Sequence, residues 1–163
     1  MYRASFSSPL GKLTLYSDGT SITAITMPVW RYQPTSKSRE LDSLPVFQQA
    51  KTWLENYFTG AANPILPPIH TGGTPFQLQV WHLLQDVPRG SFLTYGELAR
   101  RLEEITGHRT SPRAVGHAVG QNPVAIMIPC HRVLGAGGSL TGFGGGLEAK
   151  RFLLDWEGIP YHR

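Results

Sequence analysis

The chain has 163 residues, a hydrophobic content of 40% and a formal net charge of +4 at pH 7. This length supports one domain of ordinary size or two small lobes, and the hydrophobic content argues against disorder. No apolar run approaches the roughly 18 residues of a membrane span, and the first residues lack the apolar stretch of a signal peptide. We therefore expect a cytoplasmic protein with no membrane contact, which fits a single cysteine.

Residues 1–27 predict three β-strands. Turn-forming residues at positions 9–11 and again at Asp18 and Gly19 separate apolar, β-prone runs. An Asp-Gly pair in such a setting is a strong hairpin signal. We therefore expect a small antiparallel sheet at the start of the chain.

The next segments predict a loop over residues 28–43 and a helix over residues 44–60 that ends at Gly60. Segment 61–73 is rich in proline and glycine, so it predicts a linker that divides the chain into lobes 1–71 and 72–163. The expected inward face of the helix consists of Val46, Ala50, Trp53, Leu54 and Tyr57.

Two helices in the second lobe share the same start signal. Thr74 and Thr94 are the expected N-caps, and Gln77 and Glu97, three residues later, complete a capping box in each. Helical spacing then predicts the buried positions, which are Phe76, Val80, Leu83, Leu84 and Val87 in the first helix and Leu98, Leu102 and Ile105 in the second.

A third helix is expected over residues 112–120, with Ser111 as its N-cap. Two short helices joined by a glycine-containing turn suggest a helix-turn-helix, although many helical proteins contain such a pair. Arg113, in the first turn, is the one large charged side chain placed to reach forward. Small residues allow another surface to approach closely, either a neighbouring helix or a DNA groove; they are Ala114, Gly116, Ala118 and Gly120.

The C-terminal part predicts a glycine-rich loop followed by a helix. The loop lacks the ending of a phosphate-binding P-loop, so no nucleotide cofactor is expected. The helix ends at Glu157, where a carboxylate is disfavoured by the helix dipole and is either solvated or held by a polar partner. Its expected buried face consists of Ala149, Phe152, Leu153 and Trp156.

Cys130 is the only cysteine. It cannot form an internal disulfide, a redox pair or a thiolate-rich zinc site, which leaves packing or nucleophilic chemistry. Free cysteines are usually buried, and a normal thiol with a pKa near 8.5 is only slightly ionised at neutral pH. A nucleophilic Cys130 therefore needs a base, for which His131 is the candidate. In an extended segment the two side chains point to opposite faces, so we expect a water between them.

Residues 128–133, Ile-Pro-Cys-His-Arg-Val, resemble the active-site signature of the O6-methylguanine–DNA methyltransferases. The similarity extends, in the family's order, through residues 74–99, 113–123 and 142–158, whereas the N-terminal lobe resembles the family's variable domain more weakly. It implies an α+β fold, with an N-terminal lobe of a small antiparallel sheet plus a helix. The C-terminal lobe would be mostly helical, with a helix-turn-helix and an active-site cysteine loop.

The resemblance also implies the activity. Such a protein flips O6-alkylguanine out of duplex DNA and transfers the alkyl group irreversibly to its own cysteine, here Cys130. His131 would be the base, Glu157 would orient His131, and Tyr95 would assist the departing base. O4-alkylthymine stays open as a further substrate. No metal, organic cofactor or obligate protein partner is expected, and the thioether product implies a single turnover.

By the same resemblance, the helix over residues 112–120 enters the minor groove and Arg113 fills the vacated stack. The implied DNA-binding residues are Arg113, Ser111, Ala114, Gly116 and Thr94. Asn122 would brace the helix-turn-helix, and Arg132 would make structural salt bridges. The implied base-pocket and supporting residues are Asn122, Val133, Phe143, Gly144, Gly145 and Arg132.

The sequence departs from the family pattern at three places. Phe143 replaces a tyrosine and Gly144 a serine of some members, and the turn within residues 103–110 is longer than in many. These differences affect base contacts and substrate breadth.

The sequence leaves two alternative functions. One is a non-catalytic alkyl-lesion sensor on the same scaffold, but such relatives lack the cysteine. The other is a cysteine hydrolase using Cys130 and His131, which would need an oxyanion hole and leaves the DNA-binding half unexplained.

Overall fold

A computed structural model describes residues 1–61 and 65–162 and divides into two compact units. The first unit consists of Met1–Gly72 together with Pro123–Met127, and the second of Gly73–Asn122 together with the residues from Ile128 onward. Sequence reasoning assigned residues 123–127 to the second lobe, so the structure departs from a single cut of the chain. Part of the predicted linker, residues 62–64, lies outside the described residues.

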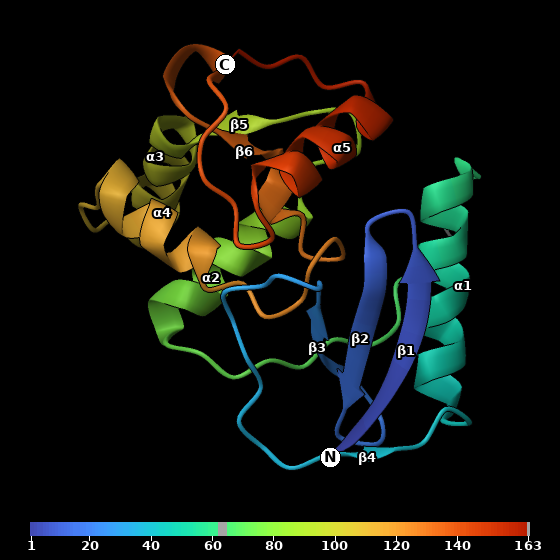
Figure 1. Cartoon of the computed structure of the whole chain (residues 1–163). Helices are drawn as coiled ribbons and strands as arrows, with labels where there is room; N and C mark the ends of the chain where they lie inside the picture. Colours follow the sequence, from blue (N-terminus) through green and yellow to red (C-terminus); the bar gives the residue numbers. More distant parts are fainter. Residues whose placement is uncertain (62–64, 163) are drawn as a thin grey trace. The chain divides into compact units, whose positions relative to one another are not determined.

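The first unit contains a sheet with the strand order β3-β2-β1-β4 (Figure 1). Strands β1 (Tyr2–Ser8), β2 (Gly11–Ser17) and β3 (Ile22–Thr26) are antiparallel neighbours, which confirms the three predicted strands and their turns. The fourth strand, β4 (Arg39–Glu40), was expected to be loop, and it runs parallel to β1. The sheet is therefore not purely antiparallel. A strand of two residues is too short to show the alternating pattern from which strands are predicted.

Helix α1 (Pro45–Thr59) packs its apolar face into the core of the first unit. The helix ends at Gly60, whose φ of 78° lies in the left-handed region that glycine adopts readily. All predicted inward positions are buried, and Phe47 joins them; the set is Val46, Phe47, Ala50, Trp53, Leu54 and Tyr57.

Backbone pairing explains why residues 123–127 belong to the first unit. The Ile25 N–H donates to the Pro123 carbonyl at 3.0 Å, and the Ala125 N–H donates back to the Ile25 carbonyl at 3.0 Å. Val124 thereby pairs with Ile25 of β3 as an isolated parallel bridge. Nothing in the local sequence specifies such a long-range partner, so the excursion could not be predicted.

The second unit contains helices α2 (Pro75–Gln85), α3 (Tyr95–Thr106), α4 (Pro112–Gly120) and α5 (Leu147–Glu157). Strands β5 (Leu93–Thr94) and β6 (Val133–Leu134) form a small parallel pair (Figure 1). Two short 3-10 turns, η1 (Cys130–Arg132) and η2 (Ala136–Gly138), flank β6. Within the described residues, no helix is long and apolar enough to cross a membrane.

The predicted helix starts in the second unit are confirmed. Thr74 and Thr94 each accept a hydrogen bond from the residue three positions later and complete a capping box, and the Ser111 hydroxyl accepts from the Ala114 N–H. Helices α3 and α4 pack together as the expected pair. The starts of these three helices are thus fixed by local sequence, because each cap satisfies backbone groups that the helix itself leaves unpaired.

Some buried positions predicted from helical spacing are wrong. Ile105 is 65% exposed and Trp156 is 39% exposed. In α5 the predicted Leu153 is buried, but it shares the buried face with Lys150 and Leu154, so the helix is rotated relative to the expectation. A prediction from helical spacing places apolar residues inward. It is wrong where a charged side chain is buried against a polar partner. Phe76, Leu83, Ala149 and Phe152 are only partly buried, whereas the unpredicted Trp81 is buried.

Candidate active site

Cys130 opens the 3-10 turn η1, directly after Pro129. The Arg132 N–H donates to the Pro129 carbonyl at 3.0 Å, and the Val133 N–H donates to the Cys130 carbonyl. These bonds close a tight turn, so the extended case, for which a bridging water is expected, is not the one found. Successive side chains of such a turn are separated by about a third of a rotation, so Cys130 and His131 do not point to opposite faces.

The Cys130 side chain is buried, with 4% of the residue exposed. Burial raises the pKa of Cys130 to about 11, against a lowering influence of the Asn122 side chain and of the Lys150 charge. The sulfur is therefore a protonated thiol at neutral pH. Any nucleophilic chemistry requires a base that removes this proton as the reaction proceeds.

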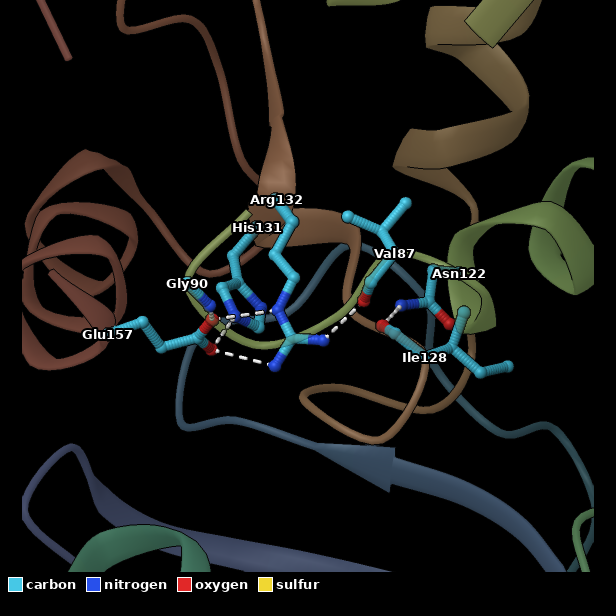
Figure 2. Close-up of polar contacts among 7 residues, drawn as sticks. All are labelled: Val87, Gly90, Asn122, Ile128, His131, Arg132 and Glu157. Atoms are coloured by element: carbon cyan, nitrogen blue, oxygen red, sulfur yellow. Dashed lines mark hydrogen bonds and ion pairs between the residues drawn. The ribbon is translucent and has the colours of Figure 1, made fainter. Parts of the chain in front are cut away.

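His131 and Glu157 form a buried hydrogen-bonded pair (Figure 2). His131 Nε2 lies 2.6 Å from Glu157 Oε2. Burial works to raise the pKa of Glu157, but the hydrogen bonds from His131 and Arg132 outweigh it and hold that pKa well below its usual range. The carboxylate can then only accept, so Nε2 carries the hydrogen.

The other imidazole nitrogen is consequently a free acceptor. Burial lowers the pKa of His131 despite the neighbouring Glu157, so the ring is neutral and Nδ1 holds a lone pair. Nδ1 is buried and has no hydrogen-bond partner in the described part of the chain. The geometry thus leaves one unused basic nitrogen in the residue adjacent to the thiol.

Arg132 and the Gly90 backbone also bind Glu157. Arg132 Nε donates to Glu157 Oε1 at 2.8 Å and Arg132 Nη2 to Oε2 at 3.0 Å, while the Gly90 N–H donates to Oε1 at 3.2 Å (Figure 2). Arg132 Nη1 also donates to the Val87 carbonyl at 2.8 Å. The carboxylate at the end of α5 is therefore held rather than solvated, and Arg132 makes the predicted salt bridge.

Asn122 connects the end of α4 to the active-site segment. Its Nδ2 donates to the Ile128 carbonyl at 2.8 Å, and the side chain is buried (Figure 2). The Asn122 N–H also caps α4 by donating to the Val119 carbonyl at 3.2 Å. One residue therefore fixes the helix-turn-helix to the chain two residues before Cys130.

Tyr95 and Gly116 face each other across α3 and α4. A Cβ atom at Gly116 would lie 3.6 Å from the Tyr95 ring, an ordinary van der Waals distance, so this helix contact does not require a glycine. The Tyr95 hydroxyl accepts from the Thr141 hydroxyl at 3.4 Å, and Thr94 uses its own hydroxyl to cap α3. Packing against Tyr95 therefore does not by itself account for Gly116.

The remaining predicted residues lie around these elements. Ser111, Arg113 and Ala114 are exposed at the start of α4, and Val133 is buried in β6. Phe143, Gly144 and Gly145 are partly buried in the loop before α5, where the Gly146 N–H donates to the Phe143 carbonyl at 3.0 Å. Within residues 1–61 and 65–162, no three His, Cys, Asp or Glu side chains are grouped as a metal site would require.

Lys150 is the residue of this region that sequence reasoning missed. It is completely buried in α5, and its Nζ donates to the Val133 carbonyl at 2.7 Å. Burial lowers its pKa to about 8, and the proximity of Cys130 acts in the opposite direction. A signal was present: Lys150, Leu153, Leu154 and Glu157 share one helical stripe at i, i+3, i+4 and i+7 spacing.

The second unit thus combines a helix-turn-helix with a buried cysteine that is followed by a histidine held by a glutamate, as in proteins that use cysteine as a nucleophile. Residues 75–159 match the family described as 6-O-methylguanine DNA methyltransferase, DNA binding domain. Residues 1–70 match the family described as 6-O-methylguanine DNA methyltransferase, ribonuclease-like domain. The chain belongs to the 6-O-methylguanine DNA methyltransferase family.

Individual relatives agree over nearly the whole chain. The methylated-DNA--protein-cysteine methyltransferase of Haemophilus influenzae is 47% identical over 162 residues, which cover 99% of this chain and 88% of the relative. The protein of the same name from Methanosarcina acetivorans is 37% identical over 97% of this chain and 99% of its own length. The crystal structure of Mycobacterium tuberculosis OGT in complex with DNA superposes with a TM-score of 0.84 at 37% identity, covering 96% of this chain and 92% of that one.

Proposed function

We propose that this protein repairs DNA by transferring the alkyl group of an O6-alkylguanine irreversibly to Cys130. One observation carries the proposal: the single thiol of a chain from this family is followed by a histidine whose Nε2 lies 2.6 Å from Glu157 and whose Nδ1 is an unused acceptor. The relatives from Haemophilus influenzae and Methanosarcina acetivorans carry the corresponding name.

The proposed reaction is a displacement at the alkyl carbon. The thiol proton of Cys130 moves to Nδ1 of His131, directly or through one water, while Glu157 holds the ring and stabilises the imidazolium that forms. A bond forms between sulfur and the alkyl carbon, and the bond from that carbon to the guanine oxygen breaks with its electron pair going to the base. The proton then passes from His131 to the guanine, so the products are a thioether and unmodified guanine. Tyr95 assists by donating a hydrogen bond to the departing base.

The thioether explains why each molecule would act once. A sulfur bound to carbon is a poor leaving group without activation, and no second thiol exists in the sequence to exchange with it. Cys130 therefore stays alkylated. The burial that raises the pKa of Cys130 to about 11 also keeps the thiol unreactive until a substrate is bound next to Cys130 and His131.

The proposed substrate is double-stranded DNA, bound through residues 72–163 without an obligate protein partner. α4 would enter the minor groove with its exposed N-terminal residues, and Arg113 would occupy the space left by the flipped base. The reducing cytoplasm is the proposed location, because a reactive thiol persists there.

A non-catalytic lesion sensor is not favoured, because Cys130 is present together with its base. Mass spectrometry after incubation with a methylated duplex separates the functions. Alkyl transfer predicts a permanent adduct of one methyl group on the peptide that contains Cys130. A sensor predicts no adduct, and a cysteine hydrolase predicts a transient adduct that is released; either outcome contradicts the proposal.

A further inference from the structure

Lys150 has no role in the reaction described above, yet it is buried beside the reacting residue. None of its surface is exposed, and its Nζ donates to the Val133 carbonyl at 2.7 Å. The same Val133 donates its N–H to the Cys130 carbonyl, so the ammonium is hydrogen-bonded to the residue that caps the turn carrying the thiol. No carboxylate among residues 1–61 and 65–162 lies within ion-pair distance of Lys150.

A buried ammonium with one carbonyl acceptor destabilises the folded state. Desolvation of a charge is compensated well only by an opposite charge and several hydrogen bonds, and apolar residues of similar volume often replace buried charges without loss of stability. A methionine would pack α5 against its neighbours as well as the lysine stem does. Fold stability therefore does not account for Lys150.

None of the charged groups around Cys130 neutralises the positive charge of the Lys150 ammonium. They are His131 and Arg132 on the turn η1, and Lys150 and Glu157 on α5. The negative charge of Glu157 is bonded to His131 and Arg132, and His131 is neutral before the reaction. The one negative charge that can arise next to Lys150 without a partner of its own is the Cys130 thiolate.

We propose that Lys150 is an electrostatic positioning residue whose ammonium stabilises the negative charge on Cys130 as the thiol proton leaves. The inference rests on the proposed role of Cys130 as the nucleophile. Lys150 keeps its own protons throughout and makes no contact with the substrate. An opposite charge within a few ångströms lowers a thiol pKa by about one unit or more, which at neutral pH corresponds to about tenfold more thiolate.

The test compares alkyl-transfer rates of wild type and Lys150→Met over a range of pH, with free O6-methylguanine as substrate so that DNA binding does not contribute. Below about pH 7 the wild type should react about tenfold faster. The pKa of Lys150 is about 8, so its charge is lost as the pH rises through that value. The ratio of the two rates should therefore fall towards one above about pH 9, and titration of the substrate cancels in this ratio.

Two controls separate charge from structure. Lys150→Gln keeps a donor for the Val133 carbonyl but carries no charge, so it should show the same pH-dependent ratio as Lys150→Met. Lys37→Met, an exposed site in the first unit, should match the wild type at every pH. Lys150→Met should melt no lower than the wild type, whereas its rate falls.

A ratio that stays constant over the whole pH range, or a Lys150→Gln protein as fast as wild type, would overturn the role of Lys150. If Lys150→Met does not fold, the Lys150→Gln profile decides alone. A wild type that transfers nothing at any pH to the free base or to a methylated duplex would instead contradict the proposed function, and the role of Lys150 with it.

Discussion

The two units of this protein bury different kinds of side chain. Among the described residues, the first unit buries the uncharged polar residues Ser17 and Thr26 within an apolar core. The second unit buries Asn122, His131, Arg132 and Lys150, together with the side chain of Glu157. Buried charge costs stability, so its concentration in one unit indicates that this unit was shaped by chemistry as well as by folding.

The largest effect is expected from removing the thiol. Cys130→Ala should abolish alkyl transfer, because the chain has no other thiol, while DNA binding is retained through the exposed start of α4. Affinity for duplex DNA should fall as salt rises, because phosphate contacts release counterions. Mass spectrometry and a fluorescence binding titration measure the two properties.

The matched control is Ser17→Ala, which trims a buried polar side chain of the first unit and should leave transfer intact. Residual transfer by Cys130→Ala, or loss of DNA binding together with transfer, would contradict this division of labour.

The second effect concerns stability. Glu157→Gln leaves His131 and Arg132 buried without their anion, and breaking a buried pair in this way costs about 3–5 kcal/mol. The exposed pair of Asp42 and Lys51 in the first unit offers the comparison, since Asp42→Asn should cost less than about 1 kcal/mol. Urea unfolding measures both. Equal losses in the free energy of unfolding would mean that the charged pairs of the two units contribute equally to stability.

The third effect distinguishes DNA opening from chemistry. Arg113→Ala should slow transfer from duplex DNA about tenfold, equivalent to about 1.4 kcal/mol, if flipping precedes a slower chemical step. Transfer from a free alkylated base should barely change, because no base has to be flipped. Lysine should rescue only partly, since its ammonium cannot stack as a planar guanidinium does.

Single-turnover rates on both substrates provide the measurement, and Arg31→Ala, an exposed arginine of the first unit, is the control. Equal losses on duplex and free base would assign Arg113 to the fold or the active site instead.

The smallest effect is expected from pH alone. Burial lowers the pKa of His131 below its ordinary value of 6.5, so the unfolded chain binds a proton more readily than the folded one. The stability contributed by the neutral ring is complete above that value and is lost as the pH falls below it. Hydrogen exchange, corrected for intrinsic rates, should show α5 and the turn η1 losing protection between about pH 7 and 5.5. An equal loss across β1–β3 would contradict a local cause.

The same contrast governs what could be predicted from the sequence. In the first unit the turn at Asp18 and Gly19 and the apolar spacing of α1 are local signals, and both are confirmed. The two-residue strand β4 and the pairing of Val124 with Ile25 depend on distant partners and carried no local signal.

In the second unit the caps at Thr74, Thr94 and Ser111 were predicted because each cap satisfies local backbone groups. The signature around Cys130 identified the candidate nucleophile, yet not its 3-10 turn. The burial of Lys150 and the exposure of Trp156 were missed, because spacing rules assume that charge faces solvent; only the helical stripe that Lys150 shares with Leu153, Leu154 and Glu157 indicated otherwise.

The most direct test of alkyl transfer to Cys130 is a titration of the wild-type protein with a duplex containing O6-methylguanine. Quantified repair should rise in proportion to protein and stop at one methyl group per molecule, with every methyl recovered as S-methylcysteine at position 130. Repair that continues beyond equivalence, or methyl groups found on other residues, would contradict a single irreversible transfer.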